Sequence, residues 1–209
     1  MKSQIKRVIL ALFIFFIMFG VGFYLAYYNF DDLTETGPIS ADMINYQENS
    51  SLRLERDTGV ETLSEEMPSE PIISPAGNKL AFIAPFQWET VGSIYIYDYE
   101  SNSLNELLSA NQIEAQNSPK GIWWYNDDYL LAIIGYAYGT VSVGGDLFLV
   151  EIETGNPRRV IGLTEYQEVK SISLDDQYIY LEIAEFDENF NEYQIIEDRI
   201  NRNRLDDVI

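Results

Sequence analysis

The chain begins with a long apolar segment and then changes to short alternations of apolar and polar residues. Residues 8–28 read VILALFIFFIMFGVGFYLAYY, without a charge, a proline or a side-chain amide. At about 1.5 Å of rise per helical residue, such a segment spans about 30 Å, the thickness of the hydrocarbon core of a bilayer. We therefore expect a transmembrane helix that runs from Val8 through Phe16 to Tyr28.

The charges that flank this segment predict its orientation. Lys2, Lys6 and Arg7 precede it, and acidic residues follow it. Because basic residues are retained on the cytoplasmic side, we expect residues 1–7 to be a cytoplasmic tail and the rest of the chain to lie outside the cell membrane. A cleaved signal peptide is the alternative, but its apolar region is usually about 7–15 residues long and ends in small residues. The pattern favours an uncleaved, single-pass signal anchor.

Beyond the anchor, the pattern is that of short β-strands separated by turns. Residues 29–49 are polar and acidic, and they predict a stalk. After them, apolar stretches such as LAFI, IYIYDY, LLAII and LFLVEI alternate with turns rich in Asn, Asp and Gly. The order of turn, strand, hairpin and strand recurs with a period of about 50 residues. We expect a β domain over residues 50–198, made of units at about 50–64, 72–110, 121–163 and 169–198, followed by a tail at 199–209.

The clearest unit carries a family resemblance. The turn SPAGN at residues 74–78 opens one strand, and IYIYD at residues 94–98 forms the next. These motifs resemble a blade of the TolB/WD40-type β-propellers. One apolar helix followed by a few such repeats also resembles membrane-anchored Bacillota proteins of unknown function. The resemblance implies an all-β fold, an incomplete or small propeller-like array of antiparallel sheets, but it implies no chemistry, because propellers host many functions.

Three units and a half-unit fall short of the four blades that a closed propeller typically needs. Three arrangements remain open: the half-unit completes a short blade with C-terminal strand material, the array stays an open arc, or two chains combine. An open arc leaves unpaired strand edges, which favour pairing with a partner protein or self-association. On this ground we expect a protein-interaction or scaffolding module.

The composition excludes many functions. The chain has 34 acidic and 13 basic residues, a formal net charge of −21, and neither histidine nor cysteine. Without these two residue types there is no Ser-His-Asp or Cys-His triad, no zinc finger, no disulfide and no cysteine for lipid attachment. The negative charge argues against binding to nucleic acid, whose phosphates need basic partners. We expect no cofactor.

Carboxylates are the remaining candidates for chemistry. The pairs at 127–128 and 175–176 recur at equivalent turns of their units, so turn formation explains them and we expect no enzyme, with a carboxylate-dependent hydrolase as the alternative. Residues 187–198 have the spacing of a calcium loop, although Glu192 stands where such a loop needs glycine. Its candidate ligands are Asp187, Asn189, Asn191 and Asp198. The alternative is an acidic hairpin tip.

Four aromatic residues fall in matching gaps of two units. Phe86 and Trp88 lie between the two strand motifs of one unit, and Tyr136 and Tyr138 lie in the same gap of the next. Matching gaps project from one side of a repeat array, so we expect the four rings to form a shared platform. Exposed rings there would anchor a protein partner or stack on cell-wall glycans, which is the alternative function. The competing interpretation is that the rings pack on one another and only cover the hairpins.

Overall fold

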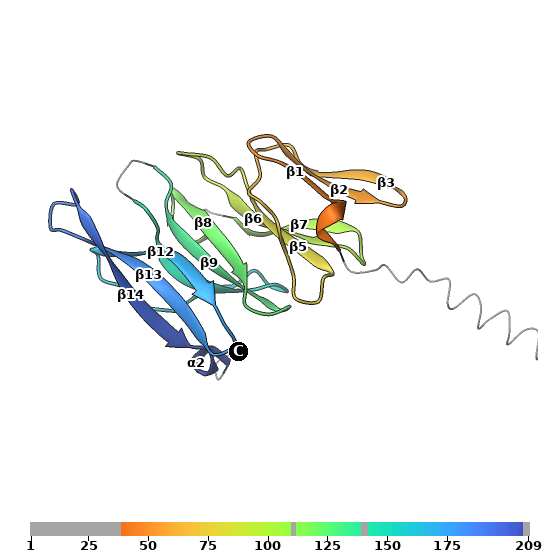
Figure 1. Ribbon diagram of the computed structural model, residues 1–209. Helices are drawn as coiled ribbons and strands as arrows, with labels where there is room; N and C mark the ends of the chain where they lie inside the picture. The colour runs from red at the N-terminus through yellow and green to blue at the C-terminus, as the bar shows by residue number, and fades with distance from the viewer. Residues whose placement is uncertain (1–38, 110–111, 139–141, 207–209) are drawn as a thin grey trace, which may run out of the picture. The chain divides into compact units, whose positions relative to one another are not determined.

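The computed structural model describes residues 39–109, 112–138 and 142–206 (Figure 1). In these ranges the chain is all-β apart from two short helices, η1 (Ala41–Met43) and α2 (Asn203–Asp206). No helix in this part of the chain is long and apolar enough to cross a membrane. The predicted cytoplasmic tail and the predicted anchor over Val8, Phe16 and Tyr28 lie outside the described residues.

The strands form four antiparallel sheets, each with its strands in chain order. Sheet I contains β1 (Ile44–Gln47), β2 (Ser51–Arg56) and β3 (Gly59–Ser64). Sheet II contains β4 (Ile72–Ile73), β5 (Lys79–Ala84), β6 (Ser93–Asp98) and β7 (Ser103–Ser109). Sheet III contains β8 (Asn117–Trp124), β9 (Tyr129–Tyr136), β10 (Asp146–Glu151) and β11 (Pro157–Arg159). Sheet IV contains β12 (Gln167–Leu174), β13 (Tyr178–Phe186) and β14 (Tyr193–Asn201).

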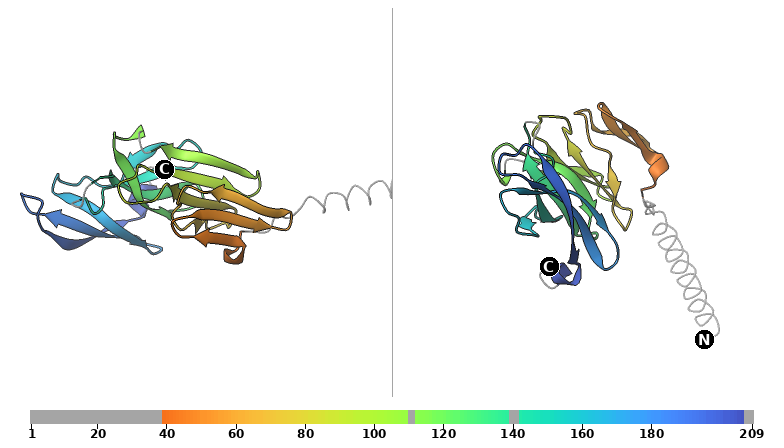
Figure 2. Two further views of the ribbon diagram at one scale, coloured as in Figure 1. Left: turned by 90° about the horizontal axis from the view of Figure 1, so that it is seen from above. Right: turned by 60° about the vertical axis from the view of Figure 1, so that its left-hand side comes forward.

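Three apolar clusters join each sheet to the next. Figure 2 shows the four sheets following one another in chain order. On β9, alternate residues serve two of them: Leu130 and Ala132 pack toward sheet II, whereas Leu131 and Ile133 pack toward sheet IV. Successive side chains of a strand point to opposite faces, so a sheet between two others must be apolar on both. The face-to-face stack of antiparallel sheets confirms the predicted all-β, propeller-like array.

The two end sheets carry charged and polar side chains on the face that packs against no other sheet. On sheet I, Asn45, Arg53 and Thr62 lie opposite one another and are exposed. On sheet IV, the exposed Glu182 and Glu197 lie side by side there. In stacked repeat proteins a polar outer face marks the terminal repeat. Of the three arrangements left open by the sequence, these polar faces favour an open arc.

The strand boundaries differ from the sequence prediction at three places. The segment predicted as a stalk contains η1 and β1, because Ile44 and Tyr46 pair with β2 opposite its buried leucines. Strand β8 begins before the predicted unit, and a register shift accommodates Pro119. At the other end, β14 and α2 extend into the predicted tail. An alternation of four residues and a proline-containing strand are both weak sequence signals.

An arginine in the predicted tail joins sheets III and IV. The Arg202 guanidinium donates hydrogen bonds to the carbonyl oxygens of Tyr125 (2.8 Å) and Asp175 (3.0 Å), and its Cζ lies 4.5 Å from the centre of the Tyr125 ring. The Tyr125 hydroxyl donates to the Arg202 carbonyl at 3.1 Å. The tail therefore contributes a specific link between sheets.

A second arginine joins sheets I and II in the same way. Arg56 donates to the Tyr97 hydroxyl (2.9 Å), to the Tyr99 carbonyl (3.1 Å) and to Asn102, and it stacks on the Tyr99 ring at 3.9 Å. The Tyr97 hydroxyl in turn donates to the Glu61 carboxylate at 2.8 Å. Burial and this hydrogen bond raise the pKa of Tyr97 to about 12, although Arg56 opposes the shift.

Replacing Arg202 tests the link between sheets III and IV. Arg202→Met keeps the aliphatic stem but leaves two carbonyl oxygens without their charged donor, so the free energy of unfolding should fall by about 1–3 kcal/mol. Arg204→Met, an exposed arginine on α2, is the matched control and should change it by less than about 0.5 kcal/mol. Urea unfolding of the full chain in nonionic detergent, followed by near-ultraviolet circular dichroism, measures both. Equal effects of the two variants would contradict the link.

The raised pKa of Tyr97 predicts a loss of stability at alkaline pH. The folded state holds the phenolic proton to a higher pH than the unfolded state, so this stabilisation is complete below pH 10 and is lost as pH rises toward 12. Wild type should therefore lose more stability across that interval than Tyr97→Phe, whose ring has no proton to release. Paired unfolding curves at several pH values check this. Parallel pH profiles would show that Tyr97 does not contribute.

Candidate functional site

The hairpins of the four sheets divide the array into two rims. Strands β2, β6, β10 and β14 hold equivalent places in their sheets, so the segments that enter them lie at one end of all four (Figure 1). We call this end the aromatic rim and the opposite end, which carries the short polar turns, the turn rim. Both arginine links belong to the turn rim.

The aromatic rim exposes most of the large apolar side chains found on the described surface. Eleven such side chains are exposed, and seven of them lie in loops or at strand ends of this rim. Trp88 is 67% exposed, the highest value of the set. The seven are Met67, Phe86, Trp88, Tyr136, Tyr138, Phe190 and Tyr193. Ile195, which is also exposed, is the third residue of β14.

Backbone hydrogen bonds connect the rim segments. The Met67 N–H donates to the Ser50 carbonyl at 3.4 Å, and the Phe86 N–H donates to the Met67 carbonyl at 2.8 Å, which links the loops of sheets I and II. Between sheets III and IV, the Glu168 carboxylate accepts the N–H groups of Val143 (2.9 Å) and Gly144 (2.8 Å). The loops that carry the exposed rings are therefore held by the sheets below them.

The four residues of the predicted platform all lie on this rim and are all exposed. Tyr136 and Tyr138 meet edge to face, with ring centres 5.7 Å apart. Within the described chain, no ring contact joins either tyrosine to Phe86 or Trp88. The equivalence of the gaps placed these residues on one rim, while their joint action as a platform stays a prediction.

A second aromatic group, at the tip of sheet IV, was missed by the sequence analysis. Phe186 lies 5.6 Å from Phe190 and 5.3 Å from Tyr193, and Tyr166 lies 5.3 Å from Phe190, measured between ring centres. The signal was present as three aromatic residues around one turn. The acidic residues between them predicted a calcium loop instead.

The predicted calcium loop is not formed. Asp187 caps the hairpin turn by accepting the N–H of Asn191 at 2.7 Å, and Asn189 lies within that turn. Asp198 lies in β14 opposite Leu181, five strand residues and about 17 Å from the start of β14. No group of three or more Asp or Glu side chains that could hold a metal ion occurs among the residues described. The hairpin separates ligands that a calcium loop would bring together.

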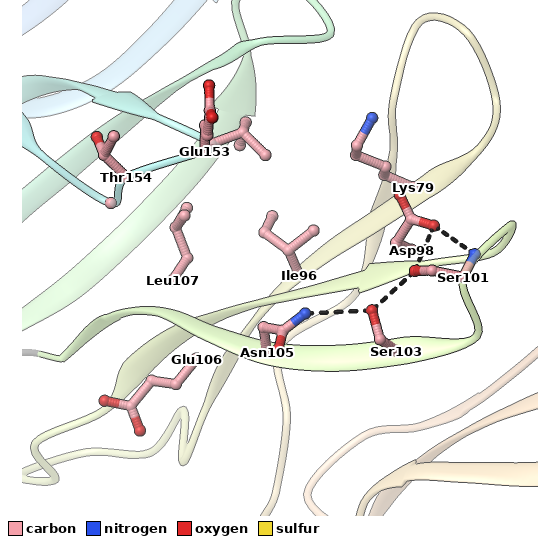
Figure 3. A pocket seen from close by; sticks show the side chains of 12 residues that line it. Lys79, Ile96, Asp98, Ser101, Ser103, Asn105, Glu106, Leu107, Glu153 and Thr154 are labelled. Atoms are coloured by element: carbon pink, nitrogen blue, oxygen red, sulfur yellow. Dashed lines mark hydrogen bonds between the residues drawn. The ribbon is translucent and has the colours of Figure 1, made fainter.

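The turn rim contains a polar cleft between sheets II and III (Figure 3). Its volume is about 410 Å³, and Lys79, Asp98 and Glu153 are among the side chains that line it. Burial raises the pKa of Asp98, but hydrogen bonds from Ser101, together with nearby Lys79, lower it overall. The Asp98 carboxylate in this cleft is therefore ionised, and it already accepts hydrogen bonds from Ser101 within its own turn.

The carboxylates considered for catalysis also serve in turns. Asp127 accepts the Ala76 N–H at 2.7 Å and so connects sheets III and II. Asp175 accepts a hydrogen bond from the Tyr180 hydroxyl and two from backbone N–H groups, which lower its pKa. A glycosidase-type acid needs a raised pKa to stay protonated at neutral pH. Asp98 and Asp175 are shifted in the opposite direction.

Replacing Glu168 tests what orders the rim between sheets III and IV. Glu168→Ala removes the acceptor of two N–H groups, so amide hydrogen exchange at Val143 and Gly144 should accelerate about tenfold or more. Glu165→Ala, an exposed glutamate three residues earlier, is the control and should leave both rates unchanged. Exchange of the full chain in nonionic detergent, read by mass spectrometry, measures the difference. Unchanged rates in Glu168→Ala would show that other contacts order this segment.

Solved structures that are similar to this chain include a lipoprotein and proteins with propeller domains. A protein described as a conserved lipoprotein of Clostridium novyi NT is 26% identical, with a TM-score of 0.57, and the match covers 64% of this chain and 86% of that one. The β-propeller domain of the Trilobed protease of Pyrococcus furiosus is 18% identical (TM-score 0.48; coverage 76% and 49%). TolB of Acinetobacter baumannii is 14% identical (TM-score 0.43; coverage 73% and 39%).

The chain thus spans less than half of the propeller domain and of TolB, but most of the lipoprotein. No curated protein matches it. One family model matches residues 86–200, which include most of sheets II, III and IV and the rim residues from Phe86 to Tyr193. Because this match covers more than half of the sequence, the chain belongs to the family described as Domain of unknown function (DUF4652).

Proposed function

We propose that this protein is a membrane-anchored, extracytoplasmic module that binds a protein partner through its aromatic rim. The observation that carries the proposal is the gathering of seven of the eleven exposed large apolar side chains at one end of the array. Aromatic residues and methionine are enriched in protein interfaces, where a few of them supply most of the binding energy. Scattered exposed apolar residues need no explanation, but a concentration on one rim does.

The rim is suited to binding because its scaffold is ordered beforehand. The loops bearing Met67 and Phe86 are linked by backbone hydrogen bonds, and Glu168 holds the segment beyond Tyr138. A surface held in this way loses less conformational entropy when a partner binds. The outer faces of sheets I and IV expose fewer large apolar side chains, namely Val60, Tyr180 and Ile195.

The charges around the rim indicate the chemistry of the partner. Glu66, Glu188 and Glu192 are exposed beside the apolar side chains, and the chain as a whole has a net charge of −21. Complementary charge accelerates association and excludes partners of like charge. We therefore infer a basic partner surface that carries apolar anchors.

The location rests on two supports. The neighbour from Clostridium novyi NT is described as a lipoprotein, a class of membrane-anchored protein. This chain has no cysteine for a lipid, but residues 8–28 are apolar enough for a spanning helix preceded by basic residues. We propose that this segment is an uncleaved anchor with a cytoplasmic N-terminus, as in the Bacillota proteins that the repeats resemble.

Glycan binding is the second candidate, favoured by the exposure of Trp88 (67%) and Tyr136 (47%). Exposed rings offer flat apolar faces on which sugar rings can stack. The anionic polymers of a cell wall would repel an acidic domain, so this function requires binding that withstands added salt. We rank it below a protein partner for that reason.

Site-specific photo-crosslinking tests the proposed surface. Benzoylphenylalanine in place of Trp88 in the full, membrane-inserted chain should give a discrete protein adduct, whereas the same group at Leu104, an exposed apolar position on the turn rim, should give none. Tyr136→Ala should reduce the adduct yield about tenfold, as expected for an interface anchor. An equal adduct at both positions, or none at Trp88, would overturn the proposal.

Co-sedimentation with isolated cell-wall sacculi distinguishes the second candidate. On the protein-partner proposal, the full chain in nonionic detergent should not sediment with sacculi in added salt. Salt-resistant sedimentation that Trp88→Ala abolishes and Leu104→Ala preserves would replace the protein partner with a glycan.

A further inference from the structure

Within the part of the chain that the structure describes, sheet IV has three strands, whereas sheets II and III have four. In those sheets, β6 and β10 are paired on both sides, by β5 and β7 and by β9 and β11. Their counterpart β14 is paired with β13 alone. Strand β14 is nine residues long, and no described strand pairs with its outer edge, although the Arg199 N–H donates a hydrogen bond to the Asp198 carboxylate at 2.7 Å.

The side chains of β14 are also poorly covered by the rest of the protein. Strands β6 and β10 have buried interiors, whereas no residue of β14 is fully buried. Ile195 is 42% exposed, and Ile196 and Ile200 are only half-buried although they pack against the core between sheets III and IV. Apolar side chains thus remain partly in water on both faces of the edge. A further strand would cover them.

The edge lacks three of the devices that protect free edges, although Glu197, Asp198 and Arg199 supply a fourth, which is charge. Natural edge strands are kept short, interrupted by proline or bent by bulges to prevent unwanted pairing. Strand β11, the free edge of sheet III, is three residues long and begins with Pro157. Strand β14 has no proline and pairs with β13 without a register shift.

Unneutralised acids line the same edge. Glu182 of β13 and Glu197 of β14 are direct cross-strand partners, an arrangement that repels in the absence of a cation. With Asp198 they line a groove of about 320 Å³. The neighbouring Arg199 stacks on the Tyr178 ring at 4.5 Å, and no described lysine or arginine forms an ion pair with Glu182 or Glu197.

We propose that β14 accepts an extended, basic segment of the partner protein as the fourth strand of sheet IV. The segment's main chain pairs with the free edge, its lysine or arginine side chains face Glu182 and Glu197, and its apolar side chains, which point to the opposite face, cover Ile196 and Ile200. Because β14 starts at Tyr193 on the aromatic rim, this edge continues the surface assigned above. The inference rests on that proposed function and specifies how the partner binds.

A second copy of the chain fits this edge poorly. Antiparallel pairing of two β14 strands about their centre would place Glu197 against Glu197, beside Asp198 of both copies. Each chain also has a net charge of −21, which opposes association. The acidic residues at the edge and the net charge of the chain therefore both favour a basic partner over self-association.

A model peptide tests strand addition directly. The probe is a fluorescent nine-residue peptide of alternating lysine and valine, added to the full chain in nonionic detergent at physiological salt. We expect it to bind and to protect alternate amides of β14 from hydrogen exchange. A peptide with glutamate in place of lysine, and a lysine peptide N-methylated on its pairing edge, should each bind at least about tenfold more weakly, because one loses the charges and the other the ladder hydrogen bonds.

Variants of the chain distinguish peptide binding at the β14 edge from general attraction of a basic peptide to an acidic protein. Glu182→Gln combined with Glu197→Gln should weaken lysine-peptide binding about tenfold, whereas Glu55→Gln, on the exposed face of sheet I, should leave it unchanged. Equal binding of the N-methylated peptide, or equal effects of the two sets of variants, would overturn strand addition. Protection of β14 without peptide, together with a dimer by light scattering, would replace the partner with a second copy.

The outcomes also separate this inference from the proposed function. An adduct at Trp88 without protection of β14 would leave the rim as the binding surface and reject strand addition. Protection of β14 without an adduct at Trp88 would reject the rim and retain the edge.

Discussion

The face-to-face packing of apolar side chains between successive sheets is the interaction on which the rest of the structure depends. A three- or four-stranded sheet cannot bury its own apolar face, so each sheet is stable only against a neighbour. Leu130 and Leu131, adjacent in β9, contribute to two different clusters, which shows how one strand is shared between two interfaces. The same requirement ends the array, because Arg53 on sheet I and Glu182 on sheet IV occupy positions that would have to be apolar for another sheet to stack.

The two rims of the array divide its structural and binding roles. On the turn rim, Arg56 and Arg202 each bond to a backbone carbonyl of the neighbouring sheet and stack on a tyrosine ring, while Asp127 connects the middle pair of sheets. These three side chains are thereby committed to holding the sheets together. The aromatic rim is ordered mainly by backbone hydrogen bonds, which leaves its side chains available to a ligand. A rigid base beneath exposed rings is the arrangement that reduces the entropic cost of binding.

Openness gives this array surfaces that a closed ring would lack. Closing a propeller pairs or covers the strands at the two ends, and here β14 has a free edge that starts at the aromatic rim. The rim supplies exposed apolar anchors, and the edge supplies backbone groups and acids. A partner that used both would be recognised by its sequence pattern as well as by its charge, which the acidic surface alone cannot achieve.

The sequence by itself determined the β-strands, their repetition and the side of the array on which Phe86, Trp88, Tyr136 and Tyr138 lie, because alternation and turn residues are local signals that recur with the repeat. Its composition also excluded chemistry that needs cysteine or histidine. Only the tertiary structure decided that the polar 41–47 segment adds η1 and β1, that Arg202 links two sheets, and that Asp187 and Asp198 lie apart. It likewise decided that, among the described strands, only β13 pairs with β14. These features depend on which strands meet across long separations in the chain, and local patterns of hydrophobicity contain no record of such pairings.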